Sequence, residues 1–150
     1  MDNDDVVDTL NKLIETCKDG EYGFRTSAQH VKSPDLQSIF LRRADDCARS
    51  AGELQELVSR LGGKVETGGS VSGALHRGWV SVKSALTGKS DAAILEECER
   101  GEDAAMARYR AALKAPLPAD VMAVVQRQFD GVQQNHDQIR TLRDQVKAVS

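Results

Sequence analysis

Apolar residues recur at three- and four-residue steps through four long stretches of this chain, which is the spacing of one face of an α-helix. The stretches cover about residues 3–30, 33–61, 90–114 and 118–150. Only three prolines and 4% aromatic residues occur among 150 residues, a composition that favours helices over sheets. The pattern predicts an all-α protein in which residues 1–150 form one domain around four long helices.

The connections between these stretches indicate how the helices are arranged. Ser33-Pro34 joins the first pair closely, with a capping serine before a proline suited to the first helical position. Pro116-Leu117-Pro118 joins the second pair. Residues 62–90 form a long crossover with a short predicted amphipathic helix. A four-helix bundle with one long crossover is a ferritin-like arrangement, so we expect that fold.

Composition and sequence exclude several classes of function. The net charge of −3 provides no basic surface for nucleic acid. No apolar run reaches the roughly 20 residues that a membrane-spanning helix needs. The acidic N-terminal residues lack the pattern of a signal peptide, so we expect a cytoplasmic protein. The three cysteines show no C-x-x-C spacing, and Cys17 and Cys47 fall in apolar stripes, which predicts small buried hydrophobic residues.

Four polar residues, each in a different predicted helix, interrupt the apolar stripes: Glu21, Arg43, Glu102 and His136. At a rise of 1.5 Å per residue, their depths measured from the helix ends agree within about one turn. We therefore expect them to meet inside the bundle. One interpretation is a structural network in which Arg43 pairs with Glu21 and Glu102 and His136 donates into the same network. Buried charges persist when they are paired.

The second interpretation is a metal site. Carboxylate-bridged metal pairs in such bundles use a Glu from each of two helices and a Glu-x-x-His motif from each of the others. Glu21 and Glu102 match the single glutamates, and Gln133 with His136 retains part of one motif. The second helix offers Arg43 in place of a ligand, which disfavours two metal ions. One iron or manganese ion on Glu21, Glu102, His136 and Gln133 is the alternative that remains.

Two further hypotheses concern binding. Arg43 offers a positive charge for a small anionic ligand in the core of the bundle. In the crossover, His76, Arg77 and Lys83 form a candidate surface patch for a partner. The simpler explanation of that patch is that Trp79 anchors the crossover while its polar neighbours face water. No residue is assigned a catalytic role.

Several short motifs together resemble a bacterial ferritin-like four-helix-bundle family of unknown function, over essentially the whole chain. They are Asp19-Gly20-Glu21-Tyr22-Gly23, Gly62-Gly63, Gly69-Ser70, His76-Arg77-Gly78-Trp79, Gly101-Glu102-Asp103 with Tyr109, and His136 followed by Arg140 and Leu142-Arg143-Asp144. The resemblance implies a bacterial, cytoplasmic ferritin-like bundle without an established activity. Di-iron proteins in the wider superfamily suggest metal.

We therefore expect a non-enzymatic and stress-related bundle, without a cofactor, that acts through a protein partner or through self-association. Two alternatives stay open. One is a metal-binding oxidoreductase or storage protein that uses iron or manganese, and the other is a binder of a small anion.

Overall fold

The computed structural model describes residues 1–65 and 88–149, and within them it contains helices and no strands. The four helices are α1 (Asn3–His30), α2 (Pro34–Arg60), α5 (Asp91–Leu113) and α6 (Ala119–Ala148). Their bounds agree with the predicted stretches to within a few residues, and the prediction of an all-α bundle is confirmed. The predicted crossover helix and the patch of His76, Arg77 and Lys83 lie outside the described residues.

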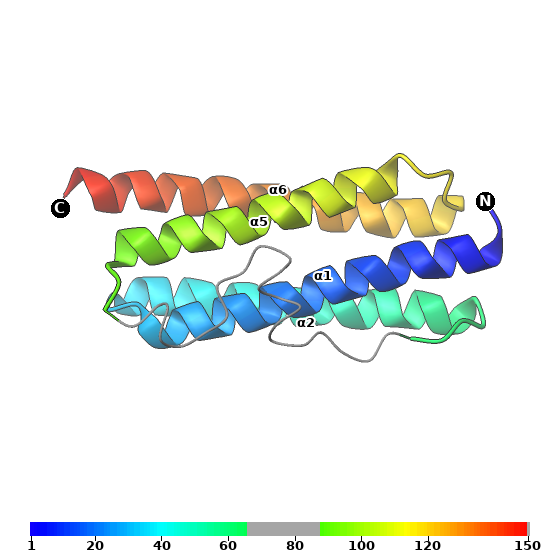
Figure 1. Ribbon diagram of the computed structural model, residues 1–150, viewed down its shortest axis with the longest axis horizontal. Coiled ribbons are helices and arrows are strands. Elements are labelled where there is room, and N and C mark those ends of the chain that lie inside the picture. The colour runs from blue at the N-terminus through cyan, green and yellow to red at the C-terminus, as the bar shows by residue number, and fades with distance from the viewer. Residues whose placement is uncertain (66–87, 150) are drawn as a thin grey trace.

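The helices lie side by side along the long axis of the molecule, and the two chain ends lie at opposite ends of the bundle (Figure 1). α1 and α2 form one antiparallel hairpin, and α5 and α6 form the other. α2 and α5 run in the same direction, as a long crossover between them requires (Figure 1). None of the described helices is long and apolar enough to cross a membrane.

Local sequence fixes the ends of the helices. Ser33 and Ser90 cap α2 and α5 by accepting hydrogen bonds from the backbone N–H groups of Leu36 and Ala93. The Asp91 carboxylate also accepts hydrogen bonds from backbone N–H groups of the α1–α2 turn, at 2.8 and 3.1 Å. This contact ties the start of α5 to the first hairpin, and so aligns the two hairpins along the bundle axis.

Two apolar clusters fill the interior, one toward each half of the bundle. On α5 the first includes Met106 and the second includes Cys98, so Glu102 lies between them. On α6 the clusters reach Val132 and Ile139, leaving Asn135 and His136 between them. The core is therefore divided by a polar layer, which is where the sequence predicted polar residues to meet.

Candidate functional site

The centre of the polar layer is an ion pair between α2 and α5. Arg43 Nε and Nη2 donate to Glu102 Oε1 and Oε2, with both nitrogen–oxygen distances at 3.4 Å. Both side chains are buried, at 9% exposed for Arg43 and 2% for Glu102. The Arg43 guanidinium also lies 5.9 Å from the centre of the Phe24 ring, within cation–π range. The distances exceed the roughly 2.7–2.9 Å of a tight charge-assisted bond, so the pair is loose.

Burial controls the electrostatics of this pair. Loss of contact with water raises the pKa of Glu102 above its ordinary value, although the charge and hydrogen bonds of Arg43 oppose the change. The amide of Asn135 also favours the charged form of Glu102. Its Nδ2 atom is nevertheless buried without a partner at hydrogen-bond distance and angle. The polar layer thus contains the Glu102 carboxylate, which is removed from water, and the Asn135 amide, whose N–H groups make no hydrogen bond of good geometry.

His136 lies at the edge of the layer and not inside the ion pair. Its Nε2 atom is 2.6 Å from Asp103 Oδ1, and its Nδ1 atom is 3.3 Å from Asp137 Oδ1. Its side chain is mostly buried, whereas both carboxylates are exposed. His136 therefore joins α6 to the outer side of α5, where its partner Asp103 is the residue that follows Glu102 in the sequence.

Glu21 does not join the buried network, and the prediction that it pairs with Arg43 is wrong. Its carboxylate accepts hydrogen bonds from Arg25 at 3.0 and 3.2 Å, and Arg25 also donates to Asp45 on α2. One-third of the Glu21 side chain is exposed. In the same part of α1, Asp19 is buried and lies 3.9 Å from Arg108. Because α1 is covered by both α2 and α5, its buried face is wide and is centred away from Glu21.

A second polar chain, which sequence reasoning missed, joins all four helices beside the ion pair. The hydroxyl of Tyr109 donates to Gln128 Oε1 at 2.8 Å, and Gln128 Nε2 donates to Glu53 Oε1 at 2.7 Å. Cys17 Sγ lies 3.2 Å from the same hydroxyl and donates to it, because the tyrosine proton is already used. Gln128 is three residues from Val125 and four from Val132, so its place in the apolar stripe was the available signal.

The space beside the ion pair is small. A cavity of about 20 Å³ is bordered by Arg43, Glu102, Tyr109, Cys17 and Cys47, among others. This volume holds roughly one water molecule, so this cavity has no room for a larger anion. The predicted burial of Cys17 and Cys47 is confirmed. Burial raises the pKa of Cys17 to about 11, which makes its thiol a poor nucleophile at neutral pH.

A much larger groove lies outside the polar layer, between α2 and α6. Its volume is about 810 Å³, and its lining is almost entirely polar. Arg43 and Ser50 border both this groove and the small interior cavity, so these side chains stand between the two spaces. The groove exists because α2 and α6 barely touch, whereas the other neighbouring helices pack closely.

The residues present do not fit the metal site considered from the sequence. Glu21 pairs with Arg25, His136 pairs with Asp103, and Gln133 is exposed. Of the four candidate ligands, Glu102 alone remains in the centre, beside the permanent positive charge of Arg43. Within residues 1–65 and 88–149, no three His, Cys, Asp or Glu side chains converge as metal ligands.

The fold has similar solved structures, although their sequences differ greatly from this one. One is a dodecameric thioferritin, the bacterioferritin-related protein from Bacteroides fragilis, with a TM-score of 0.84 and 14% identity over 99% of this chain and 90% of that chain. Another is a two-domain protein from Anabaena variabilis with DJ-1/ThiJ/PfpI-like and ferritin-like domains. It gives a TM-score of 0.79 and 15% identity over 97% of this chain and 40% of that chain. These likenesses establish a ferritin-like fold.

A search of curated proteins gave no match. A family model does match, over residues 5–115, and its description is Domain of unknown function (DUF2383). The matched region contains nearly all of α1, the whole of α2, and α5 with the turn that follows it. The chain therefore belongs to the DUF2383 family, a family of unknown function, and has a ferritin-like helical bundle.

Proposed function

We propose that this protein is a non-enzymatic ferritin-like bundle in which an internal ion pair replaces a metal centre, and that it acts by binding. The observation that carries the proposal is the buried contact between Arg43 and Glu102. Metal sites in helical bundles are built from inward-facing side chains of several helices. In the polar layer, the described part of this chain supplies one fully buried carboxylate and a guanidinium that neutralises it.

The guanidinium is a physical obstacle to a cation. Arginine does not deprotonate in proteins, so a metal ion on Glu102 would lie a few ångströms from a fixed positive charge. At an effective dielectric constant of about 20, two unit charges about 4 Å apart repel by about 4 kcal/mol. A divalent ion would roughly double that cost, and it would also have to displace the existing hydrogen bonds.

Metal analysis tests this part of the proposal. The protein is purified without chelator, and its iron and manganese contents are measured by mass spectrometry before and after dialysis against each metal. We expect far less than one ion per chain, and the same amount in the Glu102→Gln variant. An equimolar metal content that is lost in Glu102→Gln would contradict the proposal and favour a metal-binding oxidoreductase or storage protein.

We also propose that binding includes self-association, because the similar Bacteroides fragilis protein is dodecameric. Light scattering after size-exclusion chromatography measures the mass directly. We expect a defined multiple of the 16.3 kDa chain mass that persists on dilution. A mass of one chain at every concentration would contradict self-association and leave a different protein as the partner.

A further inference from the structure

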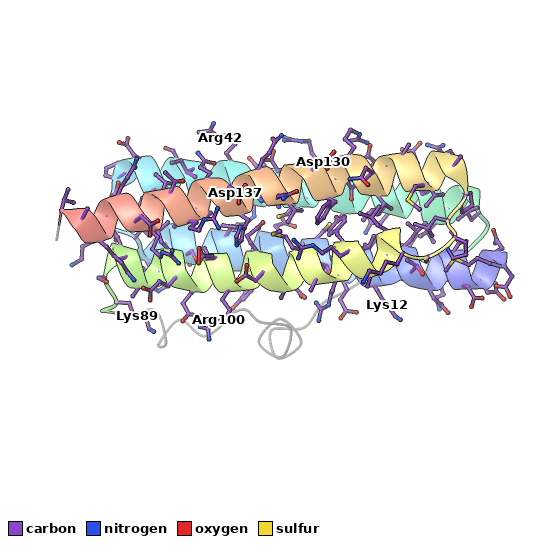
Figure 2. All side chains as sticks on the ribbon, turned by 90° about the horizontal axis from the view of Figure 1, so that it is seen from above. Lys12, Arg42, Lys89, Arg100, Asp130 and Asp137 are labelled. Carbon is purple, nitrogen blue, oxygen red and sulfur yellow. The ribbon has the colours of Figure 1, made fainter. Side chains whose placement is uncertain are left out.

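The groove between α2 and α6 is polar along its full length, but its two ends differ in the number of hydrogen-bond donors relative to carboxylate acceptors. It is bordered on α2 by residues between 42 and 56, and on α6 by residues between 127 and 138. Because α2 and α6 run in opposite directions, residues 42 and 43 face the later part of α6, around 135–138. Figure 2 shows Arg42 extending outward from the edge of α2.

At one end of the groove, the charges satisfy one another. Glu53 accepts hydrogen bonds from Arg127 and from Gln128, both on α6. Glu56 pairs with Arg60 at 3.1 Å. Each of these two carboxylates therefore has a cationic or amide donor. Among the described residues, this end shows neither an excess of donors for an anion nor a free carboxylate for a cation.

At the other end, donors exceed acceptors. Of the described residues that border this end, Asp46 is the only one with a carboxylate, and it already pairs with Arg49. Within the described part of the chain, no carboxylate lies within ion-pair distance of Arg42. Arg43 uses Nε and Nη2 on Glu102, and neither of these bonds uses its Nη1. Asn135 also borders the groove, but its Nδ2 atom is buried and its amide acts on Glu102.

From this imbalance we infer that the Arg42 end of the groove binds an oxyanion, that is, a carboxylate or phosphate group of a small molecule. Guanidinium groups recognise such groups by parallel hydrogen bonds to two oxygens. Arg42 supplies a charge from the rim, and the largely buried Arg43 guanidinium borders the groove from the side of the core. The Gln138 amide borders the same end and adds donor capacity.

The position of Glu102 suits this assignment. Its carboxylate lies behind Arg43, in the interior, and holds two of the guanidinium nitrogens at 3.4 Å. Glu102 thereby restrains the orientation of Arg43, which borders the groove and does not use Nη1 in this pair. The anion would approach a cation that is already positioned, so less side-chain entropy is lost on binding. Because the site lies outside the core, the small volume of the interior cavity does not limit the ligand.

Nuclear magnetic resonance titration of the full chain tests the inference. The ¹⁵N-labelled protein is titrated with sodium phosphate at constant ionic strength, and separately with sodium succinate. We expect saturable shifts of the Gln138 side-chain amide and of the Nε signals of Arg42 and Arg43. Saturation by either salt supports an oxyanion site. Saturation by only one of the two identifies the group as phosphate or as carboxylate.

Two arginine variants in the same groove provide the matched comparison. Arg42→Gln removes a rim charge with no ion-pair partner among the described residues, so folding should be unaffected and the affinity for phosphate should fall about tenfold. Arg127→Gln removes a charge at the other end and should leave the affinity unchanged. Shifts that do not saturate, or equal losses in both variants, would overturn the inference. Neither result bears on metal content, so this test is independent of the proposed function.

Discussion

Arg43 of α2 and Glu102 of α5 face each other across the middle of the bundle, with both nitrogen–oxygen distances at 3.4 Å. The pair lies between two apolar clusters and is shielded from water. A buried pair of this kind contributes little net stability when intact, because desolvation of the two charges offsets their attraction. Removing one of the two charges is costly, because the other charge then remains buried without a partner.

The first prediction follows from that asymmetry. Glu102→Met should reduce the free energy of unfolding by about 3–5 kcal/mol, because Arg43 is left buried without a counter-charge. Arg43→Met should also lower the free energy of unfolding, because Glu102 is then left buried without a counter-charge. The double variant Arg43→Met with Glu102→Met should be more stable than either single variant, because no unpaired charge remains. Urea denaturation measures all three, and Arg25→Met at the surface is the control, with an expected loss below about 1 kcal/mol.

Gly20 provides a second prediction, about packing beside the polar layer. A Cβ atom at this position would lie 2.9 Å from Cys47 Sγ, so alanine requires the buried Cys47 side chain to shift. We expect Gly20→Ala to lose about 1–2 kcal/mol, since overpacking outweighs the gain in helix propensity. Removing the sulfur with Cys47→Ala should relieve the clash in the double variant.

The control for Gly20 is another helical glycine, Gly131. A Cβ there would meet no atom within 4 Å, so Gly131→Ala should stabilise the protein by up to about 1 kcal/mol. Thermal denaturation of the variants gives the comparison. If Gly20→Ala were as stabilising as Gly131→Ala, the close packing of α1 on α2 at Cys47 would be disproved.

The third prediction concerns the hydrogen bond from Tyr109 to Gln128. Tyr109→Phe keeps the ring but removes the hydroxyl, which takes a buried partner from Gln128 Oε1 and from the Cys17 thiol. The free energy of unfolding should fall by about 1–3 kcal/mol. Cys17→Ala leaves the bond between Tyr109 and Gln128 intact. In the Tyr109→Phe background, Cys17→Ala should therefore lower the free energy of unfolding by less than it does in the wild type, because the hydroxyl that contacts the thiol is already absent. Strict additivity of the two substitutions would show that the contact does not form.

The fourth prediction concerns pH. Because burial raises the folded-state pKa of Glu102 above its ordinary value of 4.5, folding favours the protonated group. The stability that this proton contributes is complete below the unfolded pKa and is lost as pH rises through the folded pKa. Glu102→Gln keeps the shape and removes the titration. The stability of the wild type relative to this variant should therefore decrease as pH rises from 4.5.

Urea midpoints measured for both proteins over this range give the comparison. Glu53 and Glu96 have lowered pKa values and lose stability toward acid pH, but they are present in both proteins and cancel in the difference. A difference that is independent of pH, or that increases with pH, would show that Glu102 titrates at or below its ordinary pKa.

The amino-acid sequence alone predicted the helices and their connection, because these depend on local information. Capping residues such as Ser33 act within one turn, and apolar periodicity along a helix is set by the helix itself. Helix ends also fix depth, since the rise per residue is constant. The shared level of Glu102, Arg43 and His136 therefore follows from their distances along the chain to the helix ends.

Which polar residues contact one another was decided only by the tertiary structure. Glu21 and Asp19 are two residues apart on α1, yet Asp19 is buried and Glu21 pairs with Arg25 near the surface. The pattern of one helix does not specify this difference, because it depends on how two neighbouring helices share the surface of α1. The same holds for the bond between Tyr109 and Gln128 and for the groove between α2 and α6. Each is set by rotations and separations of helices that only the packing of the whole core determines.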